Sequence, residues 1–110
     1  MILYTIAIAI PSGMAIFFGG NFMETRIAVM GIIVENAESV EALNSLLHDY
    51  REYIIGRMGI PYKDKGISVV SIAVDAPQDV ISTLSGKVGR LDGISVKTAY
   101  SSKVYGAENV

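Results

Sequence analysis

The chain has 110 residues, a formal net charge of −2 and no cysteine. This length is typical of one small domain, and the acidic balance argues against nucleic acid as a main partner, because nucleic-acid-binding domains are usually basic. A chain without cysteine forms no disulfide, thiolate metal site or cysteine nucleophile. This agrees with the cytoplasmic location that we expect.

Residues 1–22 form an apolar extension without a charged side chain. A secretory signal would begin with basic residues, and a membrane-spanning helix would need about 20 mainly apolar residues, whereas Pro11 and the pair Gly19-Gly20 interrupt this run. Because Met23 directly precedes charged residues, we favour an over-extended gene start. The alternatives are an accessory N-terminal strand or tail and a membrane anchor, although we expect no membrane association.

The sequence alternates between strand and helix patterns from Arg26 onward. Residues 26–34 are rich in β-branched side chains and predict a first strand. Residues 39–54 predict a helix capped by Ser39 or Asn36, with an apolar stripe that consists of Val40, Leu43, Leu47, Tyr50 and Ile54. A short second strand is expected over 54–59, because Pro61 has no N–H to donate inside a central strand.

The second half of the chain repeats the pattern. Residues 66–75 predict a third strand, and a second helix begins at Pro77, whose fixed φ and missing donor suit a first helical turn. A turn at Asp92-Gly93 leads into a fourth strand that ends near residue 101. The domain is therefore expected to span 23–103, and residues 104–110 are expected to form a flexible tail.

The element order βαββαβ indicates an α+β, ferredoxin-like fold, with an antiparallel sheet and two helices on one face. Its first and third strands are central. The first is apolar on both faces and the third is nearly so, whereas a sheet with one wetted face alternates strictly. The first strand sets Ile27, Val29 and Ile33 against Ala28, Met30, Ile32 and Val34. Because the helices cover one face only, we expect a second copy of the chain to cover the other, giving a homo-oligomer, a dimer or a tetramer.

The residue types that carry catalysis or bind metals are scarce. His48 is the only histidine, so one chain lacks the ligands of a transition-metal site and shows no basis for a Ser-His-Asp triad. We therefore expect no metal, no cofactor and no enzymatic activity.

The segment 54–69, IIGRMGIPYKDKGISV, contains more glycine and charged residues than a simple turn between two strands requires. Its three glycines permit the backbone to approach a ligand closely, and Arg57 offers a planar fork for a carboxylate or phosphate. In the alternative interpretation, the glycines only shape turns, while Pro61 and the lysines discourage pairing between sheet edges.

Three segments carry a resemblance to a known family: RIAVMGIIVEN (26–36), IIGRMGIPYKDKGISVVSIAVD (54–75) and ISTLSGKVGRLDGISVK (81–97). They resemble the small ACT-like proteins named as regulators of the iron-only hydrogenase system, over about residues 24–102. The resemblance implies an ACT-like fold, also similar to the ligand-binding domain of the nickel-responsive repressor. Such domains assemble through their sheets and commonly bind small effectors at subunit interfaces.

The resemblance also implies where an effector would bind. Carried onto this sequence, the ligand-binding positions are Glu35, Asn36, Gly56, Arg57, Met58 and Gly59. We expect Arg57 to anchor an anionic group of the effector. The rim of the site would be lined by Tyr62, Lys63 and Lys65. The histidine-and-cysteine ligand set and the ribbon-helix-helix arm of the nickel repressor have no counterpart here, so neither nickel sensing nor that mode of DNA binding is expected.

The leading hypothesis is a cytoplasmic, non-enzymatic regulatory protein that binds a small effector at an oligomer interface. One alternative is an assembly module without a ligand that binds a protein partner. The other is a weak DNA-binding transcriptional regulator, which would need an oligomer that gathers its lysines on one face.

Overall fold

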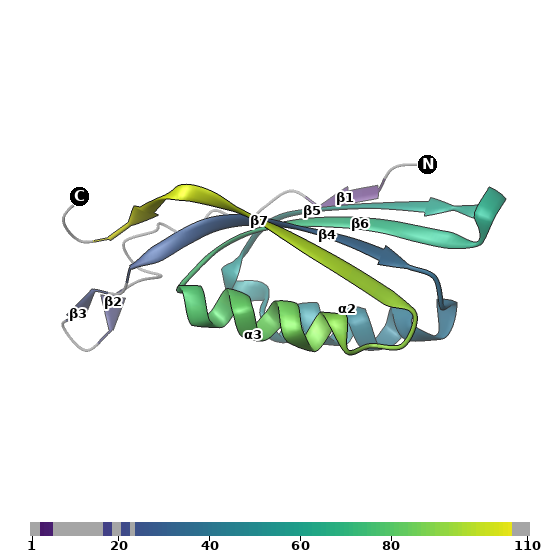
Figure 1. Ribbon diagram of the computed structural model, residues 1–110, viewed down its shortest axis with the longest axis horizontal. Helices are drawn as coiled ribbons and strands as arrows, with labels where there is room; N and C mark the ends of the chain where they lie inside the picture. The colour runs from purple at the N-terminus through teal and green to yellow at the C-terminus, as the bar shows by residue number, and fades with distance from the viewer. Residues whose placement is uncertain (1–2, 6–16, 19–20, 23, 107–110) are drawn as a thin grey trace.

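The computed structural model describes residues 3–5, 17–18, 21–22 and 24–106. Four long strands follow the expected order: β4 (Thr25–Val34), β5 (Ile54–Tyr62), β6 (Ile67–Ala76) and β7 (Ile94–Tyr105). Two helices, α2 (Val40–Asp49) and α3 (Gln78–Gly89), lie on the same face of the sheet (Figure 1). The ferredoxin-like βαββαβ fold is thus confirmed.

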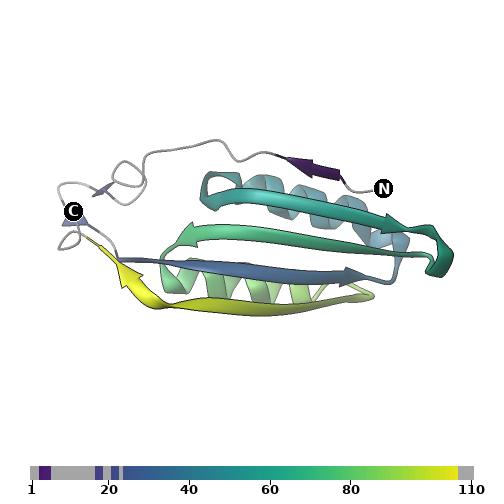
Figure 2. The same cartoon turned by 90° about the horizontal axis from the view of Figure 1, so that it is seen from above.

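Short elements complete the structure. They are the 3₁₀ helices η1 (Ala37–Ser39), η2 (Arg51–Tyr53) and η3 (Lys63–Lys65) and the strands β1 (Leu3–Thr5), β2 (Phe17–Phe18) and β3 (Asn21–Phe22). The main sheet has the order β1-β5-β6-β4-β7 (Figure 2), and all its pairs are antiparallel. Within the described part of the chain, no helix is long and apolar enough to cross a membrane.

The core lies between the sheet and the two helices. Every second residue of β4 and β6 points into it, because successive side chains of a strand alternate between faces, and Met30 of β4 is opposite Ile72 of β6. The buried apolar residues are Ala28, Met30, Ile32, Val34, Leu43, Leu47, Val70, Ile72, Val74, Ala76, Ile81, Leu84, Val88 and Ile94. Full burial of each large side chain contributes about 1.5–3 kcal/mol.

The second strand is longer than the sequence predicts. It continues to Tyr62, and Pro61 is opposite Ser68 of β6. The expected end at Gly59 was wrong because Pro61 is not inside a central strand: on its outer side, the described residues of β1 reach only from Arg57 to Gly59. Since none of the described residues pairs with Pro61 on that side, the missing N–H of the proline costs no hydrogen bond among them.

The ends of the helices also differ from expectation. The first helix stops at Asp49, so that Tyr50 and Ile54 lie beyond it. Asn36 caps η1 instead, where its Oδ1 accepts from the backbone N–H of Glu38 at 3.0 Å. Pro77 precedes α3 as its N-cap residue rather than forming its first turn.

The last strand runs beyond the expected end of the domain. After a register irregularity, β7 continues to pair with β4, and Val104 and Tyr105 are opposite Arg26 and Thr25. The remainder of the expected tail, residues 107–110, lies outside the described residues, as does most of the apolar N-terminal extension.

Candidate functional site

The face of the sheet opposite the helices, which we call the open face, is largely apolar. Alternation along the strands places ten apolar residues there: Ile27, Val29, Ile33, Met58, Ile60, Tyr62, Ile67, Val69, Ala73 and Ala99. Val29, Met58 and Tyr62 remain 46%, 39% and 43% exposed. An apolar surface of this extent is typical of an interaction site rather than of a solvated face.

Two small residues are paired near the centre of the open face. Gly31 of β4 is opposite Ser71 of β6, and Lys97 of β7 is its neighbour on the other side. Asp75 is opposite Ile27 near one end of the same face. The open face thus presents an apolar surface with one basic and one acidic side chain on its central strands and β7.

Arg57 does not point to the open face. It is opposite the core residue Ile72, so its side chain lies on the helix side, where its Nη2 donates to Oδ1 of Asn44 on α2 at 2.6 Å. Gly59, opposite Val70, shares this side, whereas Gly56 and Met58 lie on the open face. The block of expected ligand residues on β5 is therefore divided between the two faces of the sheet.

Glu35 and Asn36 are held by the turn before β7. The backbone N–H of Glu35 donates to the carbonyl of Gly93 at 2.7 Å, and Nδ2 of Asn36 donates to Oδ2 of Asp92 at 2.7 Å. Tyr62 and Lys65 lie at the far end of the β5–β6 hairpin. The structure thus distributes the expected residues over several places, and their contact with a ligand stays a prediction.

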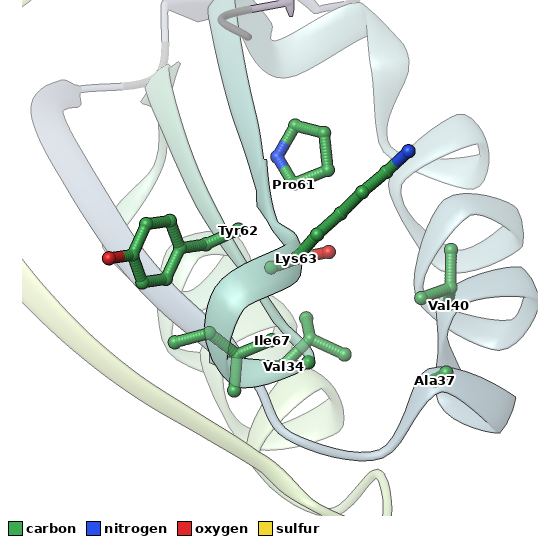
Figure 3. A pocket seen from close by; sticks show the side chains of 9 residues that line it. Val34, Ala37, Val40, Pro61, Tyr62, Lys63 and Ile67 are labelled. Carbon is green, nitrogen blue, oxygen red and sulfur yellow. The ribbon is translucent and has the colours of Figure 1, made fainter.

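A small notch lies where this hairpin meets the start of the first helix (Figure 3). Its volume is about 160 Å³. The residues that line it are Val34, Ala37, Val40, Pro61, Tyr62, Lys63, Gly66, Ile67 and Ser68. Two of the expected ligand positions belong to it, Tyr62 and Lys63. The ring of Tyr62 is turned away from Val40 and Ala37.

Sequence reasoning missed most of this notch. Val34 ends β4, Val40 begins α2, and Ser68 lies just inside β6; no motif links them. The one feature of the sequence that pointed to this region was the high glycine and charge content of the β5–β6 connection. The strand register brings the set together, because Ser68 is opposite both Val34 and Pro61.

The described residues offer few groups for acid–base or metal chemistry. Partial burial, and then the neighbouring Glu52 carboxylate, raise the pKa of Tyr53 above its ordinary value, so the phenol stays protonated near neutral pH. Within the same part of the chain, no three side chains of His, Cys, Asp or Glu gather as a metal site would require.

Comparison with known families gives a clear result. The sequence model of the family described as "TM1266-like: Iron-only hydrogenase system regulator, putative" matches residues 26–98. The chain belongs to this family. The match begins at the second residue of β4 and ends within β7, so the TM1266-like family corresponds to the ferredoxin-like domain.

A solved structure supports the same assignment. The chain is similar to the uncharacterized protein TM1266 from Thermotoga maritima, with 30% sequence identity and a TM-score of 0.67. The similarity covers 69% of this chain and 96% of that chain. No curated protein matches the chain significantly.

Proposed function

We propose that this member of the TM1266-like family is a non-enzymatic, cytoplasmic regulator that works as a homo-oligomer and binds a small effector. The open face is the observation that carries the proposal. A second copy of the chain covers this face, and an effector bound beside the interface changes how the copies associate. The link to the iron-only hydrogenase system comes from the family description.

The composition of the open face fits a second copy. Its apolar centre can pack against itself under two-fold symmetry, in which the same surface contributes from both subunits. Four strands that lie about 4.8 Å apart and are about nine residues long form a sheet face with a projected area of roughly 550 Å². This is of the same order as the ~800 Å² that each partner buries in a specific interface. Lys97 and Asp75 supply opposite charges that a second copy can match.

The change Val29→Glu tests the oligomer. Val29 is the most exposed large apolar residue of the open face, at 46%, so the lone subunit tolerates a carboxylate there. In an interface, however, the charge would be buried without a partner, at a cost of about 3–5 kcal/mol. We expect light scattering at micromolar concentration to show an oligomer for the wild type and a monomer for this variant.

The matched control is Thr83→Glu, which adds the same charge at an exposed position on α3. It should leave the oligomer intact. A monomeric wild type, or an oligomer that persists with Val29→Glu, would contradict the proposed assembly. Native mass spectrometry of protein isolated from its own cells then shows whether a small molecule or a protein partner accompanies the oligomer.

A further inference from the structure

The notch between the start of the first helix and the β5–β6 hairpin has a shape and a charge that select a ligand. We propose that it binds a small monocarboxylate with a branched aliphatic body, with the Lys63 amine holding the carboxylate. This proposal rests on the proposed function, because it identifies the chemical class of the effector.

The walls of the notch are apolar. Val34, only 3% exposed, lies at its base, and Val40 and Pro61 face each other across it (Figure 3). A volume of about 160 Å³ is close to that of an apolar protein cavity of ~150 Å³ that accommodates benzene. The notch therefore suits a body of about five or six carbon atoms rather than a nucleotide or a drug-sized molecule, whose pockets measure about 300–1,000 Å³.

Lys63 is the one charged residue that lines the notch. Its side chain extends from η3 toward α2 and passes the mouth between Pro61 and Val40 (Figure 3). Among the described residues, none forms a salt bridge or hydrogen bond with its amine. A carboxylate at the mouth would supply this partner with a charge-assisted hydrogen bond, which is stronger than a neutral one.

The lining also discriminates against an amino acid. No residue on the wall of the notch carries a carboxylate, so the ammonium group of a zwitterion would lose water without gaining an opposite charge. Ser68 also lines the notch, and its side-chain hydroxyl is able to donate a second hydrogen bond to the carboxylate. A simple acid is thus favoured over its α-amino analogue.

The position of the notch connects the ligand to the oligomer. Tyr62 and Ile67 line the notch and also belong to the open face. A ligand that orders this end of the hairpin therefore acts on side chains that a second copy would touch. This gives the regulator a direct route from ligand binding to assembly.

Titration of the full-length chain tests the inference, with 4-methylpentanoate as the probe and methyl NMR of Val34 and Val40 as the readout. We expect the acid to shift both methyl groups in a saturable manner. Leucine and the neutral 4-methylpentan-1-ol should each bind at least tenfold more weakly. If neither methyl shifts with the acid, or if the alcohol binds equally well, the proposal is overturned.

Two lysines provide matched variants, Lys63, which lines the notch, and Lys87, which does not. Lys63→Met keeps most of the length of the side chain and removes the charge, and we expect it to weaken binding at least tenfold. Lys87→Met removes the same charge from an exposed residue of α3 that does not line the notch, and it should change binding less than twofold. Equal losses in the two variants would show a general charge effect and sink the role of Lys63.

Light scattering on the same samples separates this inference from the proposed function. An oligomer that does not bind the acid overturns only the ligand assignment. A monomer that does bind it overturns the proposed assembly while leaving the site intact.

Discussion

The turn before β7 needs a residue without a Cβ at position 93, which is Gly93. It has φ +69°, and a Cβ at this position would lie 2.5 Å from Cβ of Asn36. Gly93→Ala therefore adds a clash to the cost of the left-handed backbone, and we expect a loss of about 3 kcal/mol in the free energy of unfolding. Gly66 has nearly the same φ, +66°, but open space around it, so Gly66→Ala should cost only about 1 kcal/mol. Urea denaturation measures both, and equal losses would show that the contact with Asn36 is unimportant.

The direction in which a single side chain points was the hardest feature of the site to predict from the sequence. Asn36 was expected to cap a helix and does accept from Glu38, because the preference of Asn for such caps is a local effect. The direction of Arg57 was not predictable, since it depends on the register shift of β5 against β6 between Ile54 and Gly56. Such an irregularity changes which residues reach the helix side, and no local pattern announces it.

The docking of α3 onto the sheet depends on Arg26. Its Nη1 donates to Oε1 of Gln78 at 2.9 Å, its Nη2 donates to the carbonyl of Ser101 at 2.6 Å, and its guanidinium lies 4.7 Å from the centre of the Tyr100 ring. Arg26→Met keeps much of the apolar stem and loses these polar contacts. We expect about 1–2 kcal/mol of destabilisation and faster hydrogen exchange in the first turn of α3.

Arg90→Met is the control for this prediction, because Arg90 is an exposed arginine at the other end of α3. It should leave both stability and exchange within error of the wild type. Unchanged exchange in the Arg26 variant would mean that packing alone fixes the start of the helix.

The elements themselves were largely predictable, because their patterns are local. The apolar stripe of the first helix and the two-sided apolar strands β4 and β6 follow directly from residue order. The notch was not predictable, because it is built from the ends of elements. The notch forms only because β5 continues through Pro61 to Tyr62. Whether a strand continues through a proline depends on the neighbouring strand, here β1, and this is a tertiary contact that the local sequence does not show.

At the scale of the whole molecule, we expect the domain to fold without the first 22 residues. Within the part of the chain whose burial is described, every residue of the apolar core lies between Ala28 and Ile94, and the family match covers residues 26–98. In the main sheet, the described residues of β1 form three pairs, from Leu3 opposite Gly59 to Thr5 opposite Arg57. The energetic contribution of such a short edge strand is small, because three pairs bury little apolar surface.

We therefore expect that removal of residues 1–22 leaves a folded protein whose Tm differs by less than about 4 °C, corresponding to under 1 kcal/mol. Hydrogen exchange should become faster at Arg57 and Gly59 and stay unchanged in β4 and β6, because only the partner of β5 is lost. A cooperative unfolding transition by calorimetry would establish the first point. A large drop in Tm, or faster hydrogen exchange in β4 and β6 as well as in β5, would contradict this prediction. Because β1 pairs with β5 alone, such a result would mean that the first 22 residues stabilise the whole domain.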